Sequence, residues 1–393
     1  MRAVLEVFLV FLRLGFTSFG GPIAHLGYFH NEFVLRRRWL DEEAFTDLVA
    51  LCQFLPGPAS SQVGMAIGLS RAGIKGAVAA WTAFTLPSAA LLIAFALGSN
   101  YITSSFGTGW LHGLKIVAVA VVADAVYVMG RKMCPDLKRT LIALFAGATA
   151  VIFPFAGIQA AIIFTGGLFG TVFLKSLNTH ASVTSPTIRL STRLATASLL
   201  LFFSLLLFFP ILAANTDSHA LKLVDSFYRV GSLVFGGGHV VLPLLSAEVV
   251  NPGWVSTEQF LAGYGVAQAV PGPLFTFAGY LGAVSRISPF GIVGGLICLA
   301  AVFLPSFLLI IGALPFWEKL KALPRMRTAL LGINAAVVGL LAAALYNPVW
   351  ISAIFRPSDF LLAVVCFTLL ARFKAPPIVV VILGALAGSA FVT

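Results

Sequence analysis

The chain has 393 residues, of which 59% are hydrophobic and only 10% charged, whereas soluble domains carry about 25% charged residues. With a mean hydropathy of +1.00, this composition excludes a soluble globular protein and indicates that lipid surrounds most of the chain. The net charge of +11 does not indicate nucleic-acid binding, because the basic residues lie in short segments between apolar stretches and not on one polar domain.

The first part of the chain is predicted to form short interrupted helices followed by longer ones. Proline removes a backbone donor and clashes with the preceding helical turn, so Gly20-Gly21-Pro22 and Pro56-Gly57-Pro58 should each interrupt a helix. Short helices are expected at 3–19, 22–37, 41–55 and 58–70. Longer helices are expected near 74–98, 110–130, 139–154 and 157–174.

Five apolar stretches are long enough to cross a bilayer, which takes about 20 residues. They are Gly76–Leu97, Leu111–Met129, Leu194–Ala213, Gly291–Leu314 and Thr328–Tyr346. The third of these lies between two parts of the chain that resemble each other.

The two long parts of the chain are copies of one another. Phe11–Gly21 (FLRLGFTSFGG) aligns with Phe227–Gly237 (FYRVGSLVFGG). Later matches are Glu32 with Glu248, Trp39 with Trp254, Phe45 with Phe260, Gln53 with Gln268, Pro56-Gly57-Pro58 with Pro271-Gly272-Pro273, Arg71 with Arg286, Gly76 with Gly291, and Leu86-Pro87-Ser88 with Leu304-Pro305-Ser306. Such self-similarity predicts a first repeat at 1–175, a linker with an extra transmembrane helix at 176–219 and a second repeat at 220–393.

The basic residues predict that the two repeats point in opposite directions. Residues 131–139 hold four Lys or Arg residues, whereas the matching loop at 346–360 holds only Arg356. Conversely, 98–109 holds none and its counterpart at 319–327 holds four. With a cytoplasmic N-terminus and an external C-terminus, most Lys and Arg residues would lie in the cytoplasm, as the positive-inside rule requires. We therefore predict an all-α, multi-pass inner-membrane protein with two inverted-topology repeats and interrupted helices.

Inverted repeats with interrupted helices are typical of secondary transporters, whose sites lie near the midplane between the repeats. Arg13 and Arg229 occupy matched positions, and Arg13 should lie about 15 Å inside the bilayer. A charged residue at this depth indicates a function by default, so both arginines are candidate anion ligands. For Arg13, the structural alternatives are a side chain that extends to the membrane interface and an ion pair with Glu6.

Residues around the helix breaks are further candidate ligands. Glycine lets a backbone approach a ligand, and the start of a new helix offers free N–H groups to an anion. The candidates are Gly20, Gly21, Gly236, Gly237, Gly238 and His239 at the glycine breaks, Gln53, Gly57, Gln268 and Gly272 at the Pro-Gly-Pro breaks, and the matched pair Lys115 and Asn334. The alternatives are tight turns without a ligand, glutamines that cap the breaks, and a lysine that anchors its helix at the membrane interface.

Four residues are candidates for proton coupling: Glu32, Glu248, Asp124 and His25. The two glutamates could instead lie in loops, and Asp124 matches an alanine, Ala343. Histidine titrates near neutral pH, but a lone histidine is more often structural. Motifs of hydrolases, metalloproteases and nucleotide-binding loops do not occur, so we expect neither an enzyme nor a cofactor or metal, and transport would use an ion or substrate gradient.

The combined motifs resemble the chromate ion transporter family. In the first copy, F-G-G-P precedes Trp39, Phe45, Gln53 and Pro-Gly-Pro, and the second copy reads FGGGHVVLPLL…GWV…PGP…YLG. The resemblance covers nearly the whole chain and is to the long form, in which two homologous domains are fused. It implies export of chromate across the cytoplasmic membrane, driven by the proton motive force, and chromate resistance.

Alternatives to chromate export remain open on the sequence. Chromate and sulfate are tetrahedral dianions of nearly the same shape, so a carrier of sulfate or another oxyanion fits the same residues. A passive anion channel, with a filter formed by helical hairpins, is a further alternative. The expected partners are an oxyanion, protons and the lipid bilayer, without nucleic acid, and the sequence leaves a homodimer open.

Overall fold

The computed structural model describes residues 1–106, 108–153, 156–174, 190–235, 238–321 and 323–391. Within these ranges the regular elements are all helical. The first repeat contains α1 (Arg2–Thr17), α2 (Gly21–His30) with η1 (Asn31–Arg36), α3 (Glu42–Phe54), α4 (Ala59–Phe106), α5 (Gly109–Met133), α6 (Leu137–Ile152) and α7 (Ala156–Phe173). The linking helix is α8 (Thr192–Ala214).

The second repeat follows the same order. It contains α9 (His219–Leu233), η2 (Gly238–Val240), α10 (Val241–Leu245), η3 (Ser246–Val250), α11 (Thr257–Ala269), η4 (Leu274–Thr276), α12 (Phe277–Val284), α13 (Gly291–Ala313), η5 (Leu314–Phe316), α14 (Trp317–Lys321), α15 (Pro324–Ala344), η6 (Leu345–Trp350), α16 (Pro357–Ala371) and α17 (Pro377–Phe391). Matched residues also start matched helices. Asp41 caps α3 through the Ala44 N–H (2.7 Å), and Ser256 caps α11 through the Gln259 N–H (3.2 Å).

The element α4 is a helical hairpin and not one straight helix. Its backbone leaves the helical region at Ala72 and at Gly73, where φ is +64°. A Cβ added to Gly68 would overlap the carbonyl oxygen of Gly76, although eight residues of straight helix span about 12 Å. The short limb (59–71) and the long limb (74–106) therefore pack against each other. In the second repeat α12 and α13 form the same hairpin, with Gly282 against Gly294.

Each repeat packs its last helices on the other repeat. Helices α6 and α7 contact α15, whereas α16 and α17 contact α5. Glycines make both contacts close: a Cβ on Gly113 of α5 would overlap the Gly384 carbonyl of α17, and a Cβ on the matched Gly332 of α15 would overlap the Gly166 carbonyl of α7. Small residues let helix backbones approach in this way in membranes. The same kind of contact therefore occurs twice, with the two repeats exchanged.

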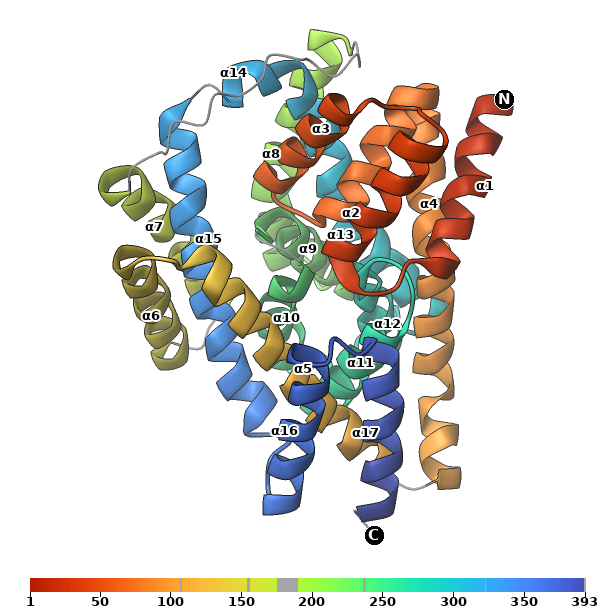
Figure 1. Ribbon diagram of the computed structural model, residues 1–393, viewed down its shortest axis with the longest axis vertical. Helices are drawn as coiled ribbons and strands as arrows, with labels where there is room; N and C mark the ends of the chain where they lie inside the picture. The colour runs from red at the N-terminus through yellow and green to blue at the C-terminus, as the bar shows by residue number, and fades with distance from the viewer. Residues whose placement is uncertain (107, 154–155, 175–189, 236–237, 322, 392–393) are drawn as a thin grey trace.

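The helices form two groups (Figure 1), and the contacts between them include those of η2, α10 and α11 with α5, α15 and α17. One group holds α1–α4 and α8–α13, and the other holds α5–α7 and α15–α17. The N-terminus and α14 lie at one end of the molecule, and the C-terminus lies at the opposite end (Figure 1).

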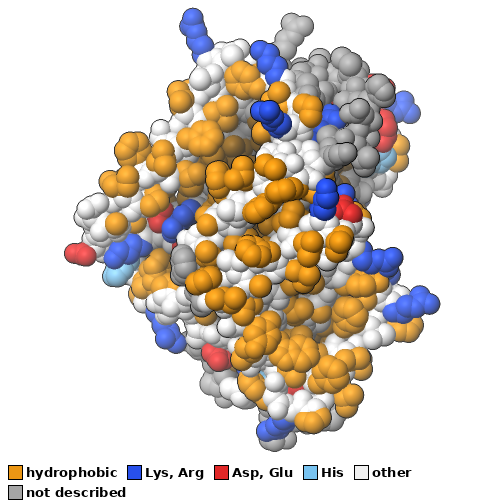
Figure 2. Space-filling model, turned by 90° about the vertical axis from the view of Figure 1, so that its left-hand side faces the viewer, with side chains coloured by type: hydrophobic (Ala, Val, Ile, Leu, Met, Phe, Trp, Pro, Cys, Tyr) orange, Lys and Arg blue, Asp and Glu red, His pale blue; other side chains and the backbone are white. Residues whose placement is uncertain are grey.

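The five apolar stretches predicted as membrane spans are confirmed as long apolar helical segments. The first lies in the α4 hairpin (Ala59–Ser99), and the others are Gly109–Met133, Thr192–Ala214, Gly291–Phe316 and Pro324–Trp350. Hydrophobic side chains lie over much of the face of the molecule that Figure 2 shows, and several of the visible Lys and Arg side chains project from its edges. Such a surface suits a multi-pass membrane protein.

Candidate functional site

The helix breaks of the two repeats meet. The Gly57 N–H donates to the Val234 carbonyl oxygen (2.7 Å), and the Gly272 N–H donates to the Ser18 carbonyl oxygen (2.9 Å). Gly57 matches Gly272, and Ser18 matches Val234, so each Pro-Gly-Pro sequence is bonded to the end of the first helix of the other repeat. We call residues 18–22, 56–58, 234–235, 238–239 and 271–273 the break junction.

The central glycines of the Pro-Gly-Pro sequences are required by conformation and by space. Their φ angles are +119° at Gly57 and +104° at Gly272, in the region that side chains rarely adopt. A Cβ on Gly57 would lie 2.6 Å from the Ser306 hydroxyl oxygen, and a Cβ on Gly272 would lie 2.8 Å from that of Ser88. Ser88 and Ser306 are also matched, so a serine hydroxyl faces the central glycine in both breaks.

The glycine breaks adjoin the same region. Gly20 and Gly21 have φ angles of +100° and +77°, and they turn the chain from α1 into α2. A Cβ on Gly238 would lie 3.3 Å from the ring of Pro22, so the start of η2 packs on the start of α2. Gly236 and Gly237, predicted as ligands, lie outside the described residues.

His25 connects the polar groups around the junction. The side chain is 1% exposed, its Nε2 lies 3.2 Å from the Ser18 carbonyl oxygen, and its Nδ1 lies 3.3 Å from the Ser60 hydroxyl oxygen. The Ser18 carbonyl also accepts the Gly272 N–H bond. One imidazole therefore links the end of α1, the start of α4 and the break of the second repeat.

Several buried polar atoms near His25 have no hydrogen-bond partner among the described residues. They are the hydroxyl oxygens of Ser18, Ser61 and Thr85 and the Oε1 of Gln62. Each of these side chains is at most 3% exposed, and the Gln62 amide nitrogen donates to the Pro56 carbonyl (2.7 Å). Buried polar groups are nearly always paired, so this cluster indicates a place for a polar ligand.

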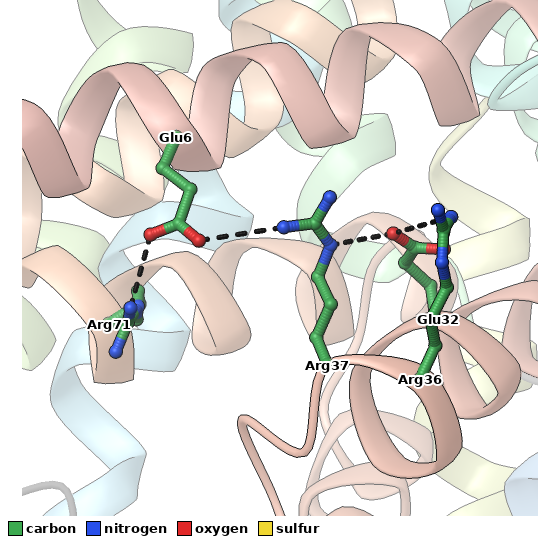
Figure 3. A network of polar contacts seen from close by, with 5 residues as sticks. All are labelled: Glu6, Glu32, Arg36, Arg37 and Arg71. Carbon is green, nitrogen blue, oxygen red and sulfur yellow. Dashed lines mark hydrogen bonds and ion pairs between the residues drawn. The ribbon is translucent and has the colours of Figure 1, made fainter.

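An ion-pair network lies on the same helices (Figure 3). Glu6 of α1 pairs with Arg37 (3.5 Å) and Arg71 (3.1 Å), and Glu32 pairs with Arg37 (2.6 Å) and Arg36 (3.0 Å). The network joins α1, the end of η1 and the turn of the α4 hairpin. The alternative pairing of Glu6 with Arg13 is wrong, because Glu6 bonds to Arg37 and Arg71.

The matched arginines have different surroundings. Arg229 lies 2.9 Å from Asp225 and 2.9 Å from Glu248, and Glu248 matches Glu32. The Arg13 side chain is exposed, and within the described part of the chain no hydrogen bond or ion pair to it is found. The structure thus places Arg229 in a buried charge cluster and Arg13 on the outer surface of the chain.

Four predicted residues lie close to the breaks without bonding across them. Gln53 is exposed at the end of α3, and Gln268 is half-buried with an Nε2 atom that lacks a partner among the described residues. The His239 Nδ1 lies 2.9 Å from the Tyr264 hydroxyl. Gly20 is exposed.

Three predicted residues lie in the other group of helices. Lys115 of α5 lies over the ring of Phe355, 5.9 Å from its centre. Asp124 is half-buried in the same helix, with one carboxylate oxygen unpaired within the described residues. Asn334 is half-buried in α15. Among the described residues, no hydrogen bond or ion pair joins Lys115, Asp124 or Asn334 to the break junction.

A cavity of about 220 Å³ lies between the two groups of helices. Its lining is uncharged, with Gln159, Ser246, Asn251, Thr257 and Asn347 as polar members. This volume is large enough for several water molecules. Because Ser246 belongs to the same short helix as Glu248, the cavity lies beside the second repeat's charge cluster.

Ser18, Ser60, Ser61 and Thr85 were not predicted from the sequence. A signal for them exists in the repeat itself, because their matched residues are Val234, Phe275, Thr276 and Phe303. A search for positions that are polar in one copy and apolar in the other would have found three of the four.

Comparisons with known proteins identify the family to which this chain is similar. The family described as "Chromate transporter" matches residues 5–171 and 221–389. A chromate transport protein of Pseudomonas aeruginosa is 28% identical over 98% of this chain and 91% of its own length. One from Cupriavidus metallidurans is 27% identical over 94% of this chain and 88% of its own length. A probable chromate transport protein of Synechococcus elongatus is 29% identical over 85% of this chain and 81% of its own.

No solved structure matches the chain. The family match covers both repeats and most of the chain, and it agrees with the multi-pass, repeated architecture described above. The chain belongs to the chromate transporter family.

Proposed function

We propose that this chain is a secondary carrier that exports chromate across the inner membrane and uses the proton motive force. Family membership supports chromate as the substrate. The observation that carries the proposal is the pair of reciprocal hydrogen bonds, Gly57 to Val234 and Gly272 to Ser18, which joins the helix breaks of both repeats. Irregular backbone at membrane depth occurs where it is buried in protein or lines a cavity, and transporters place their binding sites at such breaks.

We propose that the two repeats have inverted topology, with a cytoplasmic N-terminus and an external C-terminus. In Figure 1 the long limb of α4 ends near the C-terminal end of the molecule, whereas α13 leads to α14 at the N-terminal end. Opposite directions of these matched helices support inversion. The helix α14 carries Lys319, and its position at the N-terminal end agrees with the positive-inside rule.

We propose His25 as the coupling residue. It is the coupling candidate that contacts the break junction directly, through Ser18. Glu32 and Glu248 are each held by arginines, and Asp124 lies in the other group of helices. A proton gained by the imidazole would turn both ring nitrogens into donors, so proton movement would alter the hydrogen bonds at the junction.

Transport in inverted membrane vesicles tests the proposal. Vesicles that contain the chain should accumulate chromate when a proton gradient is imposed, with saturation, and should stop when the gradient is collapsed. Gly57→Ala and Gly272→Ala should each abolish accumulation, because both need a positive φ. Gly27→Ala is the matched control, since a Cβ there meets nothing within 4 Å.

The same vesicles distinguish the alternatives. Strong inhibition by sulfate, together with sulfate accumulation, would assign the chain to a broader oxyanion carrier. Non-saturating chromate flux that follows the membrane potential without a pH gradient would indicate a channel. Absence of gradient-driven accumulation of either anion would refute the proposed function.

A further inference from the structure

We infer that the oxyanion binds on one side of the break junction only, that of the first repeat, where uncharged donors hold it. This inference rests on the proposed function and names the ligands of its site. The donors are the hydroxyl groups of Ser18, Ser61 and Thr85, which have no partner among the described residues, and the N–H groups at the start of the α4 short limb. The ligand class is a tetrahedral oxyanion, whose oxygen atoms accept hydrogen bonds.

The two sides of the junction have matched backbones and opposite chemistry. In the first repeat Ser18, His25, Ser60, Gln62 and Thr85 surround the breaks. The matched residues of the second repeat are Val234, Val241, Phe275, Phe277 and Phe303, each at most 1% exposed. The Phe275 and Phe303 rings lie 6.0 Å apart, and these phenylalanines offer no hydrogen-bond donors. An unpaired donor does remain on this side, the Gln268 Nε2.

The residues that carry the hydroxyl groups of the first repeat are joined by a chain of contacts. His25 lies between the Ser18 carbonyl and the Ser60 hydroxyl, and its ring contacts Phe84, with ring centres 5.3 Å apart. Thr85 follows Phe84, and its carbonyl accepts a bond from the Ser88 hydroxyl (3.0 Å). That hydroxyl faces Gly272, whose N–H donates to Ser18. These contacts form a closed ring around the junction.

The start of the short limb adds backbone donors to the hydroxyl groups. The first N–H groups of a helix have no acceptor within the helix, and they favour an anion. Here the helical bonds begin with the Gln62 N–H, which donates to the Pro58 carbonyl (2.9 Å). The N–H groups of Ala59, Ser60 and Ser61 come before it. Ser61 is 3% exposed, and its hydroxyl lacks a partner within the described residues.

Thr276, which matches Ser61 in the second repeat, has a hydroxyl group with a hydrogen-bond partner. The Thr276 hydroxyl donates to the Pro273 carbonyl (2.7 Å), so it has no need of a ligand. A buried hydroxyl without a partner weakens a fold, and an uncharged cluster of them is suited to a ligand that must be released again. Donors without a full positive charge would hold a dianion less tightly than an arginine pair would.

Chromate binding to the purified full chain in lipid nanodiscs tests the inference. We measure equilibrium binding of chromate and the shift of the unfolding temperature that it causes. Ser61→Ala should weaken chromate binding about tenfold, and Ser18→Ala should weaken it in the same way. Thr276→Val should bind as the native chain does, because its hydroxyl is already bonded within its own repeat.

Unliganded stability supplies the second measurement. Ser61→Ala should be at least as stable as the native chain without chromate, because the substitution removes an unpaired buried group. Native binding by Ser61→Ala and Ser18→Ala, or equal weakening by Thr276→Val, would overturn the one-sided site while the proposed function stood. Failure of the native chain to bind chromate or sulfate would overturn the function as well.

Discussion

Gly15 gives the sharpest test of how the helices of the first repeat pack. A Cβ at Gly15 would lie 2.9 Å from the Ala83 carbonyl oxygen and 3.0 Å from that of Phe84. Both atoms belong to the backbone of α4, so no side chain can rotate away. Ordinary contact begins at 3.4 Å, and α1 must therefore withdraw by 0.5 Å in Gly15→Ala. A gap of this size removes about a quarter of the dispersion energy of the opposed atoms.

The expected cost of Gly15→Ala is about 1–3 kcal/mol of unfolding free energy. Gly27→Ala in the neighbouring α2 is the control, because its Cβ meets nothing within 4 Å. Both substitutions gain about 1 kcal/mol of helix propensity, so the difference between them isolates the contact with α4. Thermal unfolding in detergent, followed by tryptophan fluorescence, should rank Gly15→Ala below Gly27→Ala. Equal unfolding temperatures would refute the close approach of α1 and α4.

Two further predictions concern charged residues. Arg229→Ala should lower the free energy of unfolding by about 2–3 kcal/mol, because it leaves two largely buried carboxylates unpaired. Arg13→Ala, at the matched position, should change the free energy of unfolding by less than about 0.5 kcal/mol. Similar losses in the two variants would contradict this contrast. Glu6→Gln should cost about 0.2–1 kcal/mol per ion pair, less at high salt, because its side chain is 38% exposed. Glu32→Gln, at a site only 10% exposed, should cost about 1.5–3 kcal/mol, and denaturant unfolding at two salt concentrations checks both values.

The helices could be predicted from the sequence because their signals are local. Proline and glycine at 20–22 and 56–58 mark the breaks, and the apolar stretches exceed the bilayer thickness, so spans and interruptions follow from short segments. Comparison of the two repeats then extended each inference to the other half. The domain boundaries and the membrane orientation remain predictions.

The packing between the repeats could not be predicted in the same way. Contacts such as Gly113 with Gly384 join residues far apart in the sequence, and no local pattern shows which helix of which repeat is the partner. The different surroundings of Arg13 and Arg229 could not be predicted from the sequence for a related reason. A duplication suggests equal roles, but Glu32 is held by Arg36 and Arg37, and these residues have no basic counterpart at 251–253.

Because the last helices of each repeat pack on the other repeat, the order of synthesis limits when these contacts can form. The face of α5 that carries Gly113, which we call the glycine face, packs on Gly384 of α17. Gly384 is synthesised 271 residues after Gly113. At 5–20 residues per second, translation needs roughly 15–55 s to cover that distance. Throughout this interval α5 lies in the bilayer before its partner helix α17 has been synthesised. Nascent chains of this protein must therefore remain open to late insertion, and lipid or an insertion chaperone must cover the glycine face until the last helix arrives.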